Sequence, residues 1–387
     1  MRRLAHFNWR VPTGWRVMTA LLPLLAIAQP GMQRKGEFWE KDFFGNARNA
    51  RRIRINAHGP VTLQAGVANS ITYSVHLSVR ARTEAEAASV MKKYMVRADY
   101  VGDTTVITAP AGPVISTVVV KTPRIDLATI STSDGDVEAT GVDGPVIIDT
   151  GAGAVAVDRI RGDCKLNTGG GDVRVGTIGG GLRCTSQAGK INVTSVKGEA
   201  ILKTLGGDIT CREIKGPAQV ETGAGGIHIT KCGAGVNAST AGGPIVVEHA
   251  GGIVTARNLA GPVQVGAASG VQCESGSGGI RVTNITGPMR VQTSLGNIIA
   301  AVLGPKLADS FLATANGDIS VTIPSNVGVN IRAQNDMADN MRRIVSDFNS
   351  VKVRRQGRRL VAEGQVNGGG PLLQLSATVG TIFIRKQ

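Results

Sequence analysis

Aromatic side chains are scarce in this sequence, most of all in its middle. Phe, Trp and Tyr make up 3% of the 387 residues, and residues 131–304 contain none of them. A conventional core depends on a few large rings, and surfaces that bind sugars or single-stranded nucleic acids commonly stack their ligands on rings. The middle of the chain therefore favours a core of small aliphatic side chains in thin layers, and we expect no nucleic acid partner.

Motifs for phosphate, metal and nucleophile chemistry are also missing. No G-x-x-x-x-G-K-[ST] sequence occurs, and the five cysteines include no C-x-x-C pair. His228 and His249 are the only histidines of residues 131–304, and neither falls in an obvious acid–base cluster. The sequence therefore predicts that the protein is not an enzyme and has no catalytic residue, no cofactor and no bound metal.

A long apolar run is missing as well. The most apolar segment, residues 17–28, is too short to span a bilayer comfortably. It follows a basic segment and ends in Ala26-Ile27-Ala28, a combination typical of an export signal. We predict a signal peptide over residues 1–28, with an uncleaved anchor as the alternative, and a leader segment over residues 29–50. Export to the periplasm, the outer-membrane surface or the extracellular space follows.

Net charge is absent from the middle and concentrated at the ends. The chain carries a formal charge of +15, whereas residues 131–304 contain 14 Lys and Arg against 14 Asp and Glu. The densest basic run is a predicted hairpin at residues 351–361, with Lys352, Arg354, Arg355, Arg358 and Arg359 near its tip. One hypothesis is a solvated hairpin that protects a sheet edge. The other is contact with an anionic envelope polymer, lipid head groups or another surface protein.

Glycine, in contrast, is abundant and periodic. From Gly135 to Gly279 a step of nine residues meets glycine at 16 of 17 positions, the exception being Ala234. The two half-repeats differ, so the full unit has 18 residues. Apolar columns recur at this period, one of which reads Val137, Val155, Val173, Ile191, Ile209, Ile227 and Ile245. A hydroxyl column recurs with it: Thr132, Thr150, Thr168, Ser186, Thr204, Thr222 and Thr240.

This period predicts an all-β fold, a β-solenoid of stacked 18-residue coils built from short parallel strands. Glycine marks the corners, where positive φ or close backbone approach is required. After about residue 257 the register slips by one residue. We expect solenoid repeats over residues 131–304. The outward column from Glu138 mixes acidic, basic, polar and apolar residues and forms no ladder of one chemistry.

Flanking segments are expected to cap the two ends of the stack. Residues 51–130 are predicted to form an N-terminal β-rich cap, with a short helix over residues 83–95 that starts with a capping box. The aromatic cluster Phe38, Trp39, Phe43 and Phe44 is interpreted as a cap strand. Residues 305–387 are predicted to form C-terminal strands and a cap, in which residues 336–348 are a candidate second helix.

Two residue types in the repeat are candidates for chemistry and for packing. Asp136, Asp172 and Asp208 follow corner glycines, but they lie two coils apart, too far to share a calcium ion. The cysteines occupy apolar columns and are interpreted as small hydrophobes. A disulfide stays possible in an exported protein, with Cys164 and Cys184 on adjacent coils as the best candidates.

The pattern resembles a known family. The segments "INAHGPVTLQAG", "TEAEAASVMKKY" and "TANGDISVTIP", the repeated "T-x-x-G-D-V-x-V" and the ending "GGGPLLQLSATVGTIFIRK" are similar to the bacterial "putative adhesin" domain of unknown function, which is related to auto-transporter-adhesin-head-like β-solenoids. The resemblance covers about residues 50–387. It implies an exported, right-handed parallel β-helix of the bacterial envelope, and it implies no catalytic residues.

The sequence leaves three functions open. The first is a non-enzymatic envelope protein that serves as an adhesin, a scaffold or an envelope-sensing surface. The second is a carbohydrate-active enzyme of the lyase or hydrolase type, which requires two carboxylates in an outer groove. The third is a self-assembling filament, which requires uncovered solenoid ends. The oligomeric state is not predicted.

Overall fold

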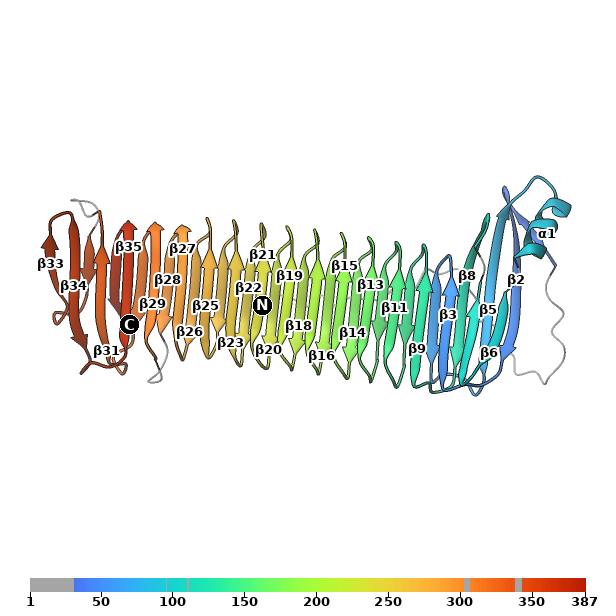
Figure 1. The fold of residues 1–387 in the computed structure, drawn as a ribbon, viewed down its shortest axis with the longest axis horizontal. Coiled ribbons are helices and arrows are strands. Elements are labelled where there is room, and N and C mark those ends of the chain that lie inside the picture. Colours follow the sequence, from blue (N-terminus) through green and yellow to red (C-terminus); the bar gives the residue numbers. More distant parts are fainter. Residues whose placement is uncertain (1–30, 95, 110, 303–306, 338–342) are drawn as a thin grey trace, which may run out of the picture.

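The chain forms a long β-solenoid. The computed structural model describes residues 31–94, 96–109, 111–302, 307–337 and 343–387, so the predicted signal peptide lies outside the described residues. Each coil gives one strand to each of two long sheets, called sheet A and sheet B, and the coils stack along the long axis in Figure 1. This confirms the predicted β-solenoid.

Sheet A is parallel except at its N-terminal end, where β1, β2 and β5 pair antiparallel. Its strands, in spatial order along the pairings, are β1 (Gln33–Lys35), β2 (Phe38–Ala47), β5 (Ile71–Arg80), β8 (Val114–Thr122), β4 (Val61–Ala65), β10 (Val137–Thr140), β12 (Val155–Asp158), β14 (Val173–Ile178), β16 (Ile191–Val196), β18 (Ile209–Ile214), β20 (Ile227–Cys232), β22 (Ile245–Ala250), β24 (Val263–Ala267), β26 (Ile280–Ile285), β28 (Ile298–Val302), β30 (Ile319–Ile323), β36 (Ile382–Lys386) and β32 (Ile344–Ser346).

Sheet B is likewise parallel except at its two ends, where β6 pairs antiparallel with β7, and β34 pairs antiparallel with β31 and β33. Its strands, in spatial order, are β6 (Arg97–Val101), β7 (Thr104–Thr108), β3 (Arg52–Ala57), β9 (Leu127–Thr132), β11 (Val146–Thr150), β13 (Cys164–Thr168), β15 (Leu182–Ser186), β17 (Ala200–Thr204), β19 (Ala218–Thr222), β21 (Val236–Thr240), β23 (Ile253–Asn258), β25 (Gly270–Ser275), β27 (Met289–Leu295), β29 (Ser310–Asn316), β35 (Leu372–Val379), β31 (Val329–Asn335), β34 (Arg359–Val366) and β33 (Lys352–Gln356).

The strand register matches the sequence period. Val137 pairs with Val155 and Val155 pairs with Val173, each 18 residues further on. The predicted slip is also confirmed, because Val254 pairs with Val271, which is 17 residues later. Residues at alternate positions of each strand point between the sheets, and the apolar columns are buried there. The core is therefore a double row of Val, Ile, Leu, Ala and Cys side chains that runs the length of the stack.

The hydroxyl column and the corner glycines form one repeated hydrogen-bonded unit. Thr168 Oγ1 donates a hydrogen bond to the Gly153 carbonyl of the preceding coil (2.9 Å) and accepts one from the Gly171 amide (3.2 Å). The same donor bond recurs from Thr150 to Thr240, and Asn258 makes it with its side-chain amide. A methyl group on Gly171 would overlap the Gly153 backbone. Close approach, rather than positive φ, therefore requires glycine at Gly171.

The order of coils in space differs from their order in the sequence at both ends. The β3–β4 coil lies between the β7–β8 coil and the β9–β10 coil. At the other end, the β35–β36 coil lies between the β29–β30 coil and the β31–β32 coil. Parallel stacking thus continues beyond residues 131–304 on both sides. In both sets of three coils, the coil that comes second in the sequence lies outermost of the three: the β7–β8 coil at the N-terminal end and the β31–β32 coil at the C-terminal end.

Aromatic side chains, absent from the middle, pack at these ends. Trp39 and Phe43 of β2 and Tyr73 of β5 cover the core near the N-terminal end, and Phe348 covers it near the C-terminal end. The single helix among the described residues, α1 (Glu84–Lys93), packs beside β5 in Figure 1 through buried Ala87 and Met91. The cap strand is therefore present, but only Trp39 and Phe43 of the predicted cluster pack on the core, whereas Phe38 and Phe44 are exposed.

The predicted N-terminal helix is confirmed. The candidate second helix over residues 336–348 is wrong for its described residues, and residues 338–342 lie outside the part of the chain that the structure describes. Thr83 caps α1, because its side chain accepts a hydrogen bond from the Glu86 amide at 3.2 Å. Residues 344–346, in contrast, form strand β32, in which Ile344 pairs with Ile382. Within the ranges that the structure describes, no helix is both long and apolar enough to cross a membrane.

Candidate functional site

The predicted basic hairpin is formed by β33 and β34, at the C-terminal end of sheet B (Figure 1). Gln356 pairs with Arg359, and Gly357 has a φ of 63°, so the turn is tight. All five predicted basic residues, Lys352, Arg354, Arg355, Arg358 and Arg359, are exposed. The structure thus places them together on the terminal edge of a sheet.

Two of these five charges are already paired. Arg354 lies 3.2 Å from Glu363, and Arg359 lies 3.1 Å from Asp336. Within the described ranges, Lys352, Arg355 and Arg358 have no ion-pair partner. The hairpin therefore keeps a surplus of three positive charges, which suits either edge protection or contact with an anion.

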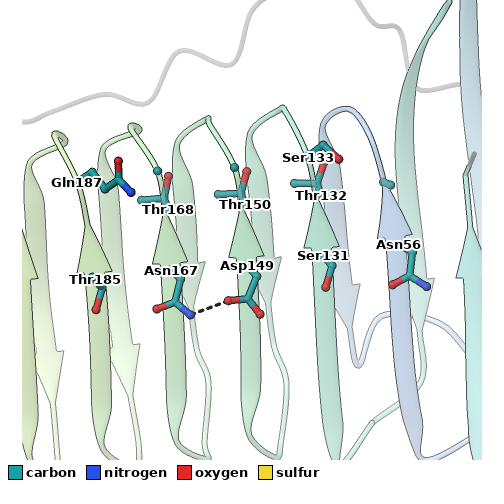
Figure 2. Close-up of a pocket in the computed structure, with 13 residues that line it drawn as sticks. Asn56, Ser131, Thr132, Ser133, Asp149, Thr150, Asn167, Thr168, Thr185 and Gln187 are labelled. Atoms are coloured by element: carbon teal, nitrogen blue, oxygen red, sulfur yellow. Dashed lines mark hydrogen bonds between the residues drawn. The ribbon is translucent and has the colours of Figure 1, made fainter. Parts of the chain in front are cut away.

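A second candidate site is a groove that the sequence did not predict. It has a volume of about 680 Å³ and crosses five adjacent strands of sheet B, from β3 to β15. Figure 2 shows its polar side chains in line along successive strands. Its lining consists of Asn56, Ala57, Ser131, Thr132, Ser133, Asp149, Thr150, Gly151, Asn167, Thr168, Gly169, Thr185 and Gln187.

One outward column runs through this groove and is polar at every coil. Its members are in register with one another and comprise Asn56, Ser131, Asp149, Asn167 and Thr185. Asn167 Nδ2 donates a hydrogen bond to Asp149 Oδ1 at 2.6 Å, drawn as the dashed line in Figure 2. The expectation that the outward columns form no sustained ladder of one chemistry still holds, because this column continues as Lys203 and Glu221. A scan of the position before each hydroxyl at a step of 18 finds the run from Ser131 to Thr185, whereas Asn56 lies outside that period and required the structure.

Carboxylates in the groove do not match the pattern of a glycosidase. Asp149 is the only acidic residue among the groove-lining residues. Glycosidases typically place two carboxyl groups across a sugar linkage, about 5–10 Å apart. The groove therefore offers hydrogen bonds to a ligand and lacks the acid–base pair for cleaving it.

His228 contacts one acidic side chain, Glu248 of the neighbouring coil. Its Nε2 lies 2.7 Å from Glu248 Oε1 on the outer face of sheet A. The sequence did not reveal this pair, but one exposed ion pair is a surface contact and does not make an acid–base cluster. Both side chains are exposed, and no group of three His, Cys, Asp or Glu side chains suited to a metal occurs in the described part of the chain.

The aspartates that follow corner glycines bind the backbone. The amides of Ala154, Lys190 and Gly226 each donate a hydrogen bond to the aspartate one coil earlier, namely Asp136, Asp172 and Asp208, at 2.8–3.0 Å. The Gly226 amide, followed by Lys190, lowers the pKa of Asp208. These carboxylates therefore join adjacent coils.

The five cysteines are buried free thiols. Cys164 pairs with Leu182 and Leu166 pairs with Cys184, so the two candidate cysteines stand on a diagonal of the sheet. Diagonal neighbours are about 7–8 Å apart, beyond the Cα separation of about 4.4–6.8 Å usual for disulfides. Burial raises the pKa of the Cys164, Cys184 and Cys273 thiols to about 12. The packing interpretation is therefore confirmed, and the disulfide candidate is wrong.

Two solved structures are similar to this chain. A "putative adhesin" from Bacteroides fragilis is 15% identical, with 70% of this chain and 100% of that chain covered and a TM-score of 0.26. A "putative cell adhesion protein" from Clostridium sporogenes is 8% identical, with 90% and 100% covered and a TM-score of 0.19. No protein-family model and no curated protein matches the chain. Both similar structures carry an adhesin description, as the sequence resemblance predicted.

Proposed function

We propose that this protein is a non-enzymatic, exported cell-surface protein that acts as an adhesin or scaffold. The observation that carries the proposal is the stack itself, which presents long outer faces on a continuous buried core. A β-solenoid is an extended surface that suits binding along its length. The resemblance to envelope solenoids supports the same location and role.

Adhesion to envelope or cell-surface material tests this proposal. The exported protein is purified from its producing cells, and its binding to intact envelope fractions is compared with binding to the same fractions after protease or glycosidase treatment. We expect saturable binding to the untreated fractions and recovery of the protein at the cell surface. A protein confined to the cytoplasm, or one that cleaves envelope polysaccharide, would contradict the proposal.

We also propose that the basic hairpin contacts phosphate or carboxylate groups of an anionic envelope polymer. Support comes from the unpaired charges of Lys352, Arg355 and Arg358, since clustered cations attract polyanions. Lipid head groups and another surface protein are the alternatives. A triple variant in which Lys352, Arg355 and Arg358 are replaced by serine should bind the anionic polymer more weakly than wild type. The matched control is a triple variant in which Lys165, Arg174 and Arg183, on the outer faces, are replaced by serine. An equal loss of polymer binding in the two triple variants would refute the contact.

The two other functions receive less support from the structure. A carbohydrate-active enzyme needs paired carboxylates. The polar groove contains only Asp149. A second groove beside sheet B contains Asp163 and Glu199, two coils apart, but Asp163 already accepts a hydrogen bond from the Gly181 amide at 2.7 Å. A filament formed by coil stacking needs open ends, whereas antiparallel strands flank the terminal coils. The adhesin or scaffold function therefore remains the best supported.

A further inference from the structure

We propose that the polar groove on sheet B binds a neutral, extended glycan that lies along the solenoid axis. This inference rests on the proposed surface function, for which it names a ligand class and a site. Four properties of the groove support it. Several of its polar side chains make no hydrogen bond to a described residue, they recur at the spacing of the strands, no Lys or Arg lies among them, and the backbone of the strands beneath is already paired within the sheet.

The groove contains polar side chains that the fold does not use. The side chains of Asn56, Ser131, Ser133, Thr185 and Gln187 make no hydrogen bond within the described part of the chain. The inward hydroxyls beside them differ, because Thr132, Thr150 and Thr168 are bonded to the backbone of neighbouring coils. Each amide side chain offers two N–H donors and one acceptor oxygen, and each hydroxyl can both donate and accept. Apart from the Asp149–Asn167 bond, the outward row thus offers donors and acceptors that the fold does not use.

The spacing of this row suits a polymer. Adjacent parallel strands lie about 4.8 Å apart, so a similar polar group recurs at that interval from Asn56 to Thr185 (Figure 2). This interval is close to the length of one sugar ring in an extended glycan. A glycan lying along the axis would meet a hydrogen-bonding side chain at each ring, while Ala57, the threonine methyls and the glycine Cα atoms would contact its C–H faces.

The charge of the groove favours a neutral ligand. No Lys or Arg lines it, and Asp149 already accepts a hydrogen bond from Asn167. An anionic polymer would meet this carboxylate without a compensating cation, which disfavours binding. The groove and the basic hairpin, at the far end of sheet B, therefore suit different ligands.

A peptide fits the groove less well than a sugar. Strands β9, β11 and β13 each pair with neighbours on both sides, so their backbone groups are not free to add a peptide strand. Protein partners also usually bury aromatic or aliphatic anchors, and the groove lining has no aromatic or large aliphatic side chain. The same absence removes the ring stacking common in sugar sites, so a glycan would be held here by hydrogen bonds and by C–H contacts alone. The many hydroxyl groups of a glycan match the polar lining in that respect.

The experiment measures binding of the full-length exported protein to neutral hexasaccharides. Cellohexaose, chitohexaose and maltohexaose are the probes, heparin fragments are the anionic comparison, and isothermal titration calorimetry gives the dissociation constants. The groove variant is Asn167→Ala with Thr185→Ala. The matched control is Asn237→Ala with Thr255→Ala, because these two residues also pair across adjacent coils on the outer face of sheet B. Thermal unfolding checks that both variants are folded.

We expect at least one neutral hexasaccharide to bind, with affinity at least tenfold weaker in the groove variant and unchanged in the control variant. The inference is overturned if none of the three sugars binds at millimolar concentration, if both variants bind like wild type, or if only heparin fragments bind. Retained adhesion of the groove variant to envelope fractions would show that the surface function stands while the groove inference falls. If the wild-type protein does not bind the envelope fractions, the proposed surface function is refuted.

Discussion

At the scale of single residues, one corner of each repeat coil depends on a hydroxyl and a glycine three positions later. The hydroxyl joins two coils through a glycine carbonyl, and the absence of a Cβ on the glycine lets the coils approach. A buried donor or acceptor without a partner costs more free energy than a hydrogen bond contributes. The regular spacing of Thr and Gly is therefore a requirement of the backbone at the corners.

Thr204→Val tests the hydroxyl. Thr204 is buried, donates to the Gly189 carbonyl at 3.0 Å and accepts from the Gly207 amide at 3.4 Å. Valine keeps the shape and leaves both backbone groups unpaired, so we expect a loss of about 1–3 kcal/mol in the free energy of unfolding. Guanidinium denaturation measures it. Thr210→Val, at an exposed outward position, should change stability by less than about 0.5 kcal/mol.

Gly171→Ala tests the close approach. Its methyl group would overlap the Gly153 backbone, whereas a methyl group on the neighbouring Gly170 meets no atom within 4 Å. Overpacking commonly costs about 1–3 kcal/mol, so we expect a clear fall in melting temperature for Gly171→Ala. Gly170→Ala should melt like wild type. Equal melting temperatures for the two variants would show that the corner tolerates a side chain.

Asp208→Asn tests the aspartate bonds through pH. The Gly226 amide and Lys190 hold the pKa of Asp208 below its ordinary value of 3.8. A depressed carboxyl pKa stabilises the fold above the unfolded-state value, and this stabilisation is lost as pH falls through the folded-state pKa. The variant should therefore melt below wild type at pH 7, and the difference should shrink toward pH 3. Melting curves across this range measure it, and a constant difference would contradict the mechanism.

The residue columns were predictable from sequence, whereas the partners of single side chains were not. Periodicity fixes which residues point inward, and Val137 and Val155 are buried as predicted. The pair of His228 with Glu248 joins residues 20 positions apart on different coils. Its geometry depends on rotamers, which a column of letters does not contain.

At the scale of elements, the terminal strands determine how the sheets end. Among the described strands, β33 pairs only with β34, which leaves its other side without a described neighbour, and every residue from Lys352 to Gln356 is exposed. Lysine and arginine on such an edge oppose pairing with another chain. Edge protection and anion contact are compatible roles, since both need the same exposed charges.

Replacing Lys352, Arg354 and Arg355 with threonine tests edge protection. Threonine favours strands and carries no charge, so the edge of β33 would become a template for a second copy. We expect concentration-dependent self-association, measured by sedimentation velocity. Replacing Lys165, Arg174 and Arg183 with threonine removes the same charge from the outer faces and should leave the sedimentation coefficient unchanged. Identical behaviour of both variants would assign the effect to net charge.

Local signals predicted one helix correctly and a second one wrongly. The capping residues Thr83 and Glu86 are contiguous with α1, so the sequence signal was sufficient there. Residues 336–348 have a comparable polar and apolar pattern, yet Ile344 becomes part of β32 because it pairs with Ile382. Pairing with a distant strand overrides local propensity, and a local pattern does not contain that partner.

At the scale of the whole molecule, the stack is a sum of nearly equivalent units. Most coils contact only the coil before and the coil after. Stability in such arrays depends on each unit and on its two interfaces. Length should therefore be adjustable in whole units, and only in whole units.

Deleting residues 189–206 removes one unit and tests this. Val173 of β14 would then meet Ile209 of β18 in the register it now shares with Ile191, so we expect a folded protein with a β-sheet circular dichroism spectrum. Deleting residues 189–197 removes half a coil and would place every later strand on the opposite sheet. That variant should fail to fold. Comparable folding of both deletions would show that the two half-repeats are interchangeable.

The interleaved ends were beyond what the sequence predicts. The 18-residue period fades near both ends, and nothing in it shows that β35 and β36 insert beside β29 and β30. Only the three-dimensional pairing shows this. The resemblance and the period together predicted the β-solenoid, while the topology of its ends and the groove required the structure.

The position of β35 and β36 has a consequence for the timing of folding. These strands are synthesised after β31–β34, yet they lie between those strands and the rest of the stack. A chain that emerges from its N-terminus onward cannot dock β31 in its final place before residues 372–386 have arrived. This end of the stack can therefore be completed only after residues 372–386 have been synthesised, although β31–β34 precede them in the chain.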